Sequence, residues 1–394
     1  MKQLITLCAA VAAVSAFADP TPAATVSTIC RESGRYLGWP TICRRANGEL
    51  LVAFSGDRDE HVCPWGKVQM VRSTDGGETW SDPVTIRSSS IDDRDAGIIE
   101  LKDGTLVVFT FSSVYYATRG NKRYNRICHE LPKEKVREEI GYWSLRSTDG
   151  GKTWEKPVRM KGSAPHGGIQ LKDGRLLMVG YSHNQYGGLW PEYLPVLPRP
   201  ELTVETSSDG ARSWQVIARI APPERIWTSG LCEPHVVELD DGTLVAQIRY
   251  HDENDGILQT ESTDGGKTWS EIHETGIPGF PPHLIKLADG RILSSYGRRD
   301  EGHYGEYAAV SSDGGKSWAV DAFALDVNPP CFPWDLGYPS TVQFPDGSFL
   351  TTYYQAADKE TKPRLMATRW RFPRTEGLEE GFLTPPHAAK PHTW

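Results

Sequence analysis

Residues whose side chains could take part in catalysis occur at the same distance before several of six turns, each of which contains a glycine. The residue eight or nine places before the turn glycine is, in chain order, Trp39, Asp95, Pro165, Glu233, Pro281 and Tyr338. A carboxylate can act as a general base, and a tyrosine hydroxyl that such a base activates can act as a nucleophile. If one architectural position gathers these side chains, the chain can combine an acid, a base and a nucleophile in one site.

Arginines stand at the ends of the strands that are expected to follow these turns. They are Arg58, Arg249 and the adjacent pair Arg298 and Arg299. Guanidinium groups bind carboxylates through charge-assisted, often bidentate hydrogen bonds. Unpaired charges inside a β-rich core are costly, so this set requires either mutual pairing or a charged ligand. Two alternatives follow: a structural arginine–carboxylate network that plugs the centre, or a binding site for an acidic molecule.

A nonapeptide with the pattern Ser-x-Asp-x-Gly-x-x-Trp occurs five times and fixes the architecture. The copies are "RSTDGGETW", "RSTDGGKTW", "TSSDGARSW", "ESTDGGKTW" and "VSSDGGKSW", with aspartates Asp75, Asp149, Asp209, Asp264 and Asp313. The carboxylate suits a tight turn, because it can accept hydrogen bonds from nearby backbone N–H groups. The tryptophan that follows offers a large surface to bury. The repeat is therefore structural, and it defines the register of the chain.

Six Asn-Gly or Asp-Gly pairs between short apolar runs are interleaved with these turns. Their glycines are Gly48, Gly104, Gly174, Gly242, Gly290 and Gly347, and such pairs indicate β-hairpins. Units of four strands repeated in this way predict an all-β, six-bladed β-propeller with four-stranded antiparallel blades. The last unit lacks one strand, which the N-terminal segment from Thr25 to Glu32 can supply. We expect one propeller domain over residues 19–394.

Two long segments interrupt the regular blades. The polar segment from Ser112 to Ile140 can include a short helix, and the segment from Ser182 to Leu202 is rich in aromatic residues and proline. Both are expected between the second and third strands of a blade. Either segment can contribute to a binding site or can decorate the surface.

The composition and the N-terminal sequence limit the classes of function that the chain can have. The chain has 394 residues and a net charge of −8, which argues against a nucleic-acid partner. Residues 1–18 read as a signal peptide cleaved after Ala18, which predicts a secreted or periplasmic protein. No other segment approaches the ~20 apolar residues of a membrane span. Six further cysteines permit disulfides without defining the pairs, and no ligand spacing predicts a metal or another cofactor.

These motifs together resemble the sialidase (neuraminidase) family, whose six-bladed propellers carry such Asp boxes, and the resemblance covers nearly the whole mature chain. "CEPHVVELDDGTL" is similar to the family's segment with a general-base glutamate, which implies that role for Glu233. "GYPSTVQFPDGS" is similar to the segment with the nucleophilic tyrosine, which implies Tyr338. "LVAQIRYH" and "LSSYGRRDEG" are similar to strands with carboxylate-binding arginines, hence Arg249 and either Arg298 or Arg299.

The resemblance is incomplete around the first blade. "LLVAFSGDRDEH" implies an accessory arginine at Arg58, and "DDRDAGIIEL" implies a substrate-contacting Asp95. The family's first arginine is replaced by Gly38, beside Trp39, and either Arg58 or Arg94 could substitute for it at the substrate. The position of the acid stays open among Asp59, Glu60, His61, Asp93 and Asp95.

The resemblance implies an exported exo-glycosidase that removes a terminal sialic acid, or a related acidic sugar, from a glycan. A neutral tyrosine nucleophile fits such a substrate, because the sugar's own carboxylate repels an anionic nucleophile. The lost arginine favours an altered substrate, such as a uronic or ketodeoxy acid. Two alternatives remain: a uronate exo-glycosidase or lyase on the same scaffold, and a carbohydrate- or protein-binding propeller without catalysis. Linkage preference and oligomeric state are not defined by the sequence.

Overall fold

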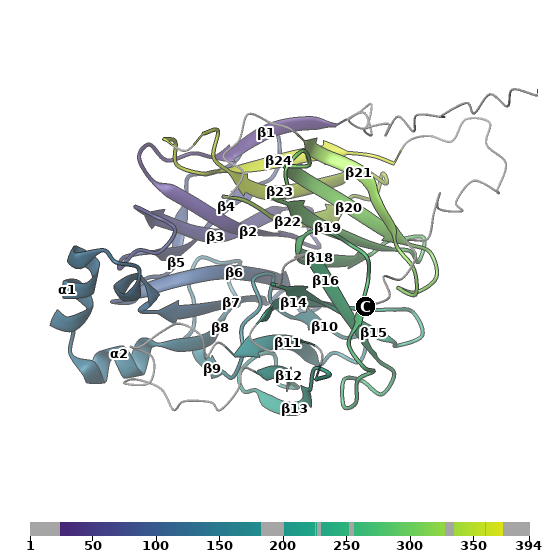
Figure 1. Cartoon of the computed structure of the whole chain (residues 1–394), viewed down its shortest axis with the longest axis horizontal. Coiled ribbons are helices and arrows are strands. Elements are labelled where there is room, and N and C mark those ends of the chain that lie inside the picture. The colour runs from purple at the N-terminus through teal and green to yellow at the C-terminus, as the bar shows by residue number, and fades with distance from the viewer. Residues whose placement is uncertain are drawn as a thin grey trace, which may run out of the picture.

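The computed structural model describes residues 24–182, 201–224, 226, 230–251, 256–327, 335–358 and 360–372. Within these ranges the chain forms six four-stranded antiparallel sheets, which are the blades of one propeller (Figure 1). The predicted six-bladed, all-β fold is therefore confirmed. The expected signal peptide and the segment between Ser182 and Leu202 fall mainly outside the described residues.

Blades one to three follow the chain in simple order. Their strands are β2 (Tyr36–Arg44), β3 (Leu50–Arg58), β4 (Lys67–Ser73), β5 (Val84–Arg87), β6 (Asp92–Glu100), β7 (Leu106–Ser113), β8 (Gly141–Ser147), β9 (Val158–Met160), β10 (Ile169–Gln170), β11 (Leu176–Ser182), β12 (Glu201–Ser207) and β13 (Gln215–Ile220). Each sheet pairs its strands sequentially, so the first strand of a blade is also one edge of its sheet.

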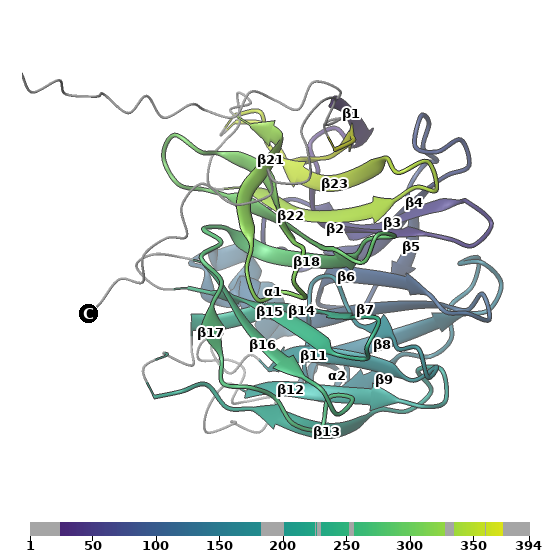
Figure 2. The same ribbon diagram turned by 90° about the vertical axis from the view of Figure 1, so that its right-hand side faces the viewer.

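Blades four to six continue the same pattern around the ring (Figure 2). Their strands are β14 (Leu231–Glu238), β15 (Leu244–Tyr250), β16 (Gly256–Ser262), β17 (His273–Glu274), β18 (Phe280–Lys286), β19 (Ile292–Arg298), β20 (Gly305–Ser311), β21 (Ala319–Val327), β22 (Leu336–Gln343), β23 (Phe349–Gln355) and β24 (Arg364–Trp370). First strands of neighbouring blades contact one another, for example β2 with β6 and β22, so they line the central axis.

The N-terminal strand closes the ring. Strand β1 (Thr25–Cys30) pairs antiparallel with β24 and completes blade six, with Val26 opposite Thr368. This confirms the predicted closure, which joins the two ends of the described chain in one sheet and leaves no gap in the ring.

The turns behave as their residues predict. The six hairpin glycines have φ angles between 79° and 92°, a left-handed region that glycine adopts without strain. In each Asp box the aspartate closes the turn: Asp149 accepts hydrogen bonds from the Ser147 hydroxyl and from the backbone N–H groups of Lys152 and Thr153. These bonds, together with one from the Thr153 hydroxyl, lower the pKa of Asp149.

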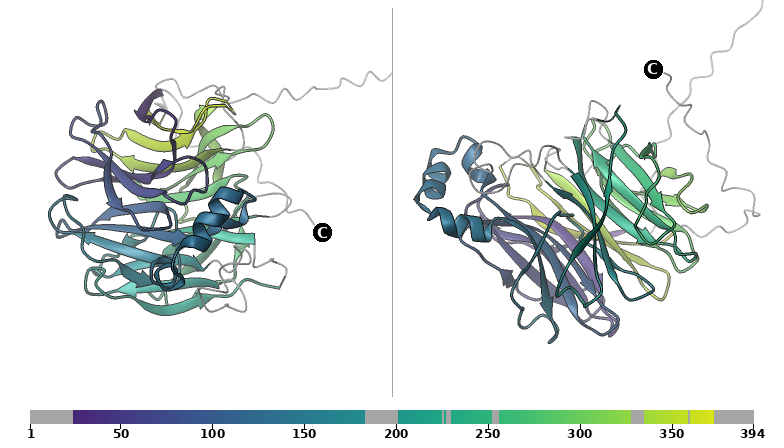
Figure 3. Two further views of the ribbon diagram at one scale, coloured as in Figure 1. Left: turned by 90° about the vertical axis from the view of Figure 1, so that its left-hand side faces the viewer. Right: turned by 90° about the horizontal axis from the view of Figure 1, so that it is seen from below.

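The predicted helical insertion is present between the second and third strands of blade two. It contains a 3-10 helix (Tyr115–Thr118), α1 (Lys122–Glu130) and α2 (Lys133–Glu139), and it lies at one end of the blade's strands (Figures 1 and 3). Tyr116, Tyr124 and Cys128 form its small core, which also buries Val62 from the loop after β3. The insertion therefore braces a loop of blade one.

Three further observations complete the fold. Among the described helices, none is long and apolar enough to cross a membrane. The five cysteines within the described ranges are all buried: Cys30, Cys43, Cys63, Cys128 and Cys232. The described residues also include no group of three or more His, Cys, Asp or Glu side chains arranged to hold a metal ion.

Candidate active site

Four of the six aligned positions share an unusual backbone conformation. Trp39, Asp95, Glu233 and Tyr338 have φ angles of 53°, 50°, 50° and 56°, and each lies at an irregularity in the pairing of the first two strands of its blade. Left-handed backbone is uncommon for residues other than glycine, and bulges of this kind re-aim a side chain. Strained backbone of this kind concentrates at functional sites.

Tyr338 and Glu233 are brought into direct contact across the axis. The Tyr338 hydroxyl donates a 2.5 Å hydrogen bond to Oε1 of Glu233. Nη1 of Arg249 donates to Oε2 of Glu233 at 2.7 Å and to the Tyr338 hydroxyl at 3.3 Å. Tyr338 and Arg249 are 6% and 5% exposed, so water screens this trio weakly.

The trio's electrostatics assign a protonation state to each member. Burial raises the pKa of Tyr338, and the Glu233 carboxylate raises it further, so the phenol keeps its proton at neutral pH. Burial also opposes the charge of Glu233, but Arg249 and the hydrogen bonds outweigh it and lower the pKa of Glu233 to about 2. The free protein thus presents a neutral phenol that is hydrogen-bonded to a carboxylate able to accept its proton.

Asp95 lies close enough to the trio of Tyr338, Glu233 and Arg249 for the charge of Glu233 to raise its pKa. Burial raises the pKa of Asp95 to about 7, with Arg94 opposing the rise and Glu233 adding to it. Its backbone N–H is held by the Ser55 hydroxyl of blade one at 2.9 Å. Asp95 therefore contributes a carboxyl group that is protonated in part of the molecules at neutral pH.

Trp39 fills the region beside the missing arginine. Its side chain is 1% exposed, and the guanidinium carbons of Arg94 and Arg58 lie 4.4 and 5.2 Å from the centre of a Trp39 ring. A Cβ atom at Gly38 would start 3.0 Å from the ring of Tyr36 and 3.7 Å from that of Tyr354. Aromatic rings therefore occupy the space around Gly38, and Arg94 rather than an arginine at position 38 is the cation nearest to Trp39.

Of the predicted arginine pair, the structure brings Arg299 toward the site. Its guanidinium donates to the Leu336 carbonyl oxygen at 2.6 Å and lies 5.3 Å from the centre of the Phe280 ring. Arg249 stacks on the same ring at 3.7 Å. Arg298 instead forms ion pairs with Asp300 and Asp321 within blade five, because successive side chains of a strand point to opposite faces.

Two other predicted residues are engaged in structural contacts. Arg58 is 0% exposed and pairs with the equally buried Asp92 at 2.7 Å. Asp59 points to Arg35, at 2.6 Å, and its side chain is 38% exposed. Arg58 forms an ion pair with Asp92 because an unpaired charge buried inside the blade would cost a large amount of free energy.

This buried pair leads to a stability prediction. Replacing Asp92 by asparagine leaves Arg58 as a buried charge without its partner, and we expect a loss of about 3–5 kcal/mol in the free energy of unfolding. Urea denaturation followed by tryptophan fluorescence measures it. Asp59→Asn is the matched control, since its pair with Arg35 is on the surface and should matter by less than about 1 kcal/mol. Equal, small losses in both variants would contradict the assignment.

A cluster of three buried histidines was not anticipated from the sequence. His166, His235 and His283 come from blades three, four and five, with ring centres 4.7–5.9 Å apart, and His166 lies 6.4 Å from the Tyr338 ring. Burial lowers the pKa of His235 to about 3 and holds the pKa values of His166 and His283 well below their usual range. The signal was present, because His235 and His283 each stand two residues after an aligned position.

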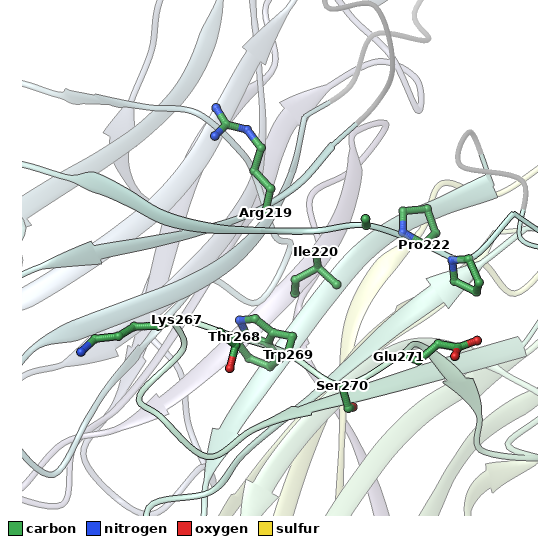
Figure 4. Close-up of a pocket in the computed structure, with 10 residues that line it drawn as sticks. Arg219, Ile220, Pro222, Lys267, Thr268, Trp269, Ser270 and Glu271 are labelled. Atoms are coloured by element: carbon green, nitrogen blue, oxygen red, sulfur yellow. The ribbon is translucent and has the colours of Figure 1, made fainter.

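A separate hollow lies on the outer part of the ring. It has a volume of about 520 Å³ and is lined by residues 219–223, at the end of β13 and just after it, and by residues 267–271, at the end of the blade-four Asp box and just after it (Figure 4). Trp269 and Ile220 supply apolar surface there, and none of its lining residues belongs to the trio or to its neighbours. The chemistry of the axial residues, rather than the size of this hollow, defines the candidate site.

The fold and this axial cluster define the class of protein: an Asp-box propeller with a tyrosine–glutamate–arginine centre. A model of the BNR repeat-like domain matches residues 48–351, and the chain belongs to that family. The family and the fold agree with the resemblance to sialidases that the sequence motifs indicated.

Individual relatives are distant. A sialidase of Bacteroides fragilis is 24% identical over 319 residues, which cover 72% of this chain and 54% of that protein. The xyloglucanase Xgh74A of Acetivibrio thermocellus is 28% identical over 227 residues, which cover 54% of this chain and 23% of that protein. The chain thus spans about half or less of these curated relatives.

Among solved structures, a protein of unknown function from Dyadobacter fermentans superposes with a TM-score of 0.71 at 24% identity. The match covers 89% of this chain and 99% of that one. At this identity the likeness establishes the fold and leaves the chemistry to be argued from the site.

Proposed function

We propose that the protein is a retaining exo-glycosidase of sialidase type, which hydrolyses a terminal sialic acid or a related acidic sugar from a glycan. The observation that carries the proposal is the hydrogen bond from Tyr338 to Glu233, with Arg249 bound to both. We further infer that residues 1–18 direct export and that residues 19–394 act as a single domain. The sialidase relatives support the reaction class.

The proposed reaction uses the protonation states of the trio. As the Tyr338 oxygen attacks the anomeric carbon, its proton passes to Glu233, so no free phenolate has to form beside the sugar's carboxylate. Arg249 stabilises the charge that shifts from Glu233 toward the phenolic oxygen, because its Nη1 contacts both groups. Water then releases the sugar from Tyr338, and the tyrosine recovers its proton from Glu233.

The cations around the trio indicate an acidic sugar. Arg249 bonds to Glu233 and Tyr338, Arg94 lies 4.4 Å from the centre of a Trp39 ring, and Arg299 donates to the carbonyl oxygen of Leu336. Guanidinium groups of this kind can bind a carboxylate. The sialidase family keeps its first arginine at the position of Gly38. In this chain the neighbouring Trp39 offers an apolar contact where that arginine would offer a charged one. This difference favours a sugar whose acidic or N-acyl groups are placed differently from those of common sialic acids, and it keeps a uronate-specific enzyme as the second candidate.

A substrate panel tests the proposal. The mature protein is assayed with 4-methylumbelliferyl glycosides of sialic acid, ketodeoxynonulosonic acid, glucuronic acid and neutral galactose, and NMR follows the anomer that is released first. We expect release of a 2-keto acid with retained configuration and none of galactose. Activity on the glucuronide alone would support the second candidate. Inactivity on the whole panel would contradict catalysis by this trio.

A further inference from the structure

The proposed reaction needs a group that protonates the departing glycosidic oxygen and later deprotonates water. Resting on the proposed function, we propose that His61 is this acid–base residue and that Tyr36 and Asp335 hold it in place. Position 61 is in the loop after β3, and Asp335 directly precedes β22, so blades one and six together build the group.

A short hydrogen-bond chain connects the three side chains. Nδ1 of His61 lies 3.0 Å from the Tyr36 hydroxyl, which donates to Oδ1 of Asp335 at 2.6 Å. Nδ1 is also 3.5 Å from Oδ1 of Asp335 itself. With its hydroxyl hydrogen directed to Asp335, Tyr36 accepts the Nδ1 proton of His61, and the neutral imidazole therefore carries its lone pair on Nε2. Such a backing carboxylate orients an imidazole and stabilises its protonated form.

The other edge of the imidazole is available. The side chain of His61 is 48% exposed, and Nε2 forms no hydrogen bond to any residue that the structure describes. By contrast, the side chains of Tyr36 and Trp39 beside it are almost fully buried. A half-exposed imidazole at the edge of a buried cluster can reach the glycosidic oxygen of a substrate from the solvent side.

His61 shares its walls with the nucleophile. Its ring packs edge-on against Trp39 at 4.8 Å, and Trp39 packs in the same manner against Tyr338 at 6.3 Å. Tyr354 donates a hydrogen bond to Asp335 at 3.1 Å, and its ring lies 5.9 Å from that of Tyr338. The acid–base group and the nucleophile are thus two sides of one aromatic cluster.

The loop that carries His61 is fixed by the buried arginine of blade one. Nη2 of Arg58 donates to the carbonyl oxygen of His61 at 2.9 Å, and Nε donates to that of Glu60 at 3.4 Å. The next residue but one, Cys63, donates its backbone N–H to Asp92 at 3.3 Å. Arg58 therefore acts as a positioning residue for the loop that carries His61.

The other acid candidates fit less well. Asp59 is turned toward Arg35 on the surface, and Asp93 is 0% exposed and bound to Arg87. Asp95 is 8% exposed and lies within the electrostatic reach of Glu233, on the nucleophile's side of the cluster. Of these residues, His61 alone combines a half-exposed side chain with a partly buried carboxylate, Asp335, behind it.

The groups around His61 determine the pH at which its imidazole becomes protonated. Packing against its neighbours and the cations Arg94 and Arg58 outweigh the raising effect of Asp335 and lower the pKa of His61 to about 4, so the imidazole of the free protein is neutral at neutral pH. An acidic sugar bound at Arg94 offsets these cations and favours the protonated imidazole. A carboxylate-bearing substrate therefore helps to charge its own acid.

The proton balance closes over the two steps. In the first step Nε2–H of His61 transfers its proton to the glycosidic oxygen as the bond to the anomeric carbon breaks and Tyr338 attacks, with the tyrosine's proton moving to Glu233. In the second step neutral His61 takes a proton from water as the water oxygen attacks the same carbon. The Tyr338 oxygen leaves and regains its proton from Glu233.

Leaving-group dependence tests the inference. His61→Ala is compared with wild type on the 4-methylumbelliferyl glycoside of the preferred sugar, whose leaving group needs little protonation, and on a disaccharide of the same sugar. We expect kcat/KM for the disaccharide to fall about 10²–10⁴-fold, with a much smaller loss for the aryl glycoside. The loss of activity on the basic side of the wild-type pH profile should disappear. Tyr36→Phe should shift that pH profile while retaining part of the activity.

The controls separate this inference from the proposed function. His273→Ala removes an equally exposed histidine that pairs with a carboxylate, Glu261, at 2.9 Å in blade four, and it should change neither substrate's kinetics. If wild type is active but His61→Ala loses both substrates equally and keeps its pH profile, the inference is wrong and the proposed function stands. The same holds if Asp95→Asn shows the leaving-group signature instead. Inactivity of wild type on all acidic glycosides overturns both.

Discussion

Replacing Tyr338 by phenylalanine is expected to lower kcat by at least about three orders of magnitude, which corresponds to about 4 kcal/mol of transition-state stabilisation. The substitution removes only the hydroxyl that bonds to Glu233 and Arg249, so the pocket keeps its shape and KM should change far less. Glu233→Gln should cost a comparable amount, because the two groups act as one unit and their losses are not additive. Steady-state kinetics on the preferred aryl glycoside measures both.

Tyr353→Phe is the matched control for this prediction. Tyr353 lies in the same blade, is fully buried and donates a 2.6 Å hydrogen bond to a carboxylate, Asp326. Loss of the Tyr353 hydroxyl should lower the free energy of unfolding and leave kcat near the wild-type value. Full activity of Tyr338→Phe, or equal losses of kcat in the two variants, would contradict a nucleophilic Tyr338.

The second large effect is expected in the pH dependence of stability. His166, His235 and His283 are neutral in the folded protein because burial lowers their pKa values, whereas an unfolded histidine titrates near pH 6.5. Below pH 6.5 the unfolded chain binds more protons, so the free energy of unfolding falls as the pH falls toward about 3. Each histidine adds up to about 1.4 kcal/mol per pH unit to the slope of the free energy of unfolding against pH, so the three together add up to about 4 kcal/mol per pH unit.

Urea denaturation at a series of pH values between 7.5 and 5 measures this slope. Exchanging His283 for glutamine should reduce the slope by up to about 1.4 kcal/mol per pH unit, because one proton fewer is taken up on unfolding. His129→Gln is the control, since His129 is exposed in the last turn of α1 and should leave the slope unchanged. A wild-type slope below pH 6 that equals that of His283→Gln would contradict a neutral histidine cluster.

The fold was predictable because its signals are local and repeated. Each hairpin glycine and each Asp-box aspartate specifies a turn from within a few residues, and five or six copies remove the ambiguity of a single one. Counting back from those glycines was sufficient to place Glu233, Tyr338 and Asp95 at equivalent positions. The missing strand of blade six followed from the same count and was confirmed in β1.

What the sequence could not provide depends on side-chain directions and on contacts between distant segments. Period-two alternation decides that Arg298 faces its own blade while Arg299 faces the neighbouring one, and an uncertain strand end leaves this choice open. The Arg58–Asp92 pair and the Tyr36–Asp335 bond join different blades, the second across 299 positions. The left-handed backbone at the aligned positions has no signature in residues such as tyrosine and tryptophan.

Trapping a covalent intermediate tests the central claim most directly. The protein is incubated with 2,3-difluoro derivatives of sialic acid and ketodeoxynonulosonic acid, in which the anomeric fluoride leaves readily and the second fluorine slows release from the enzyme. Mass spectrometry of the intact protein and its peptides should find one sugar attached to Tyr338, and none in Tyr338→Phe. A label on Glu233 or Asp95, or turnover of the natural glycoside with inverted configuration and without any label, would contradict a tyrosine nucleophile.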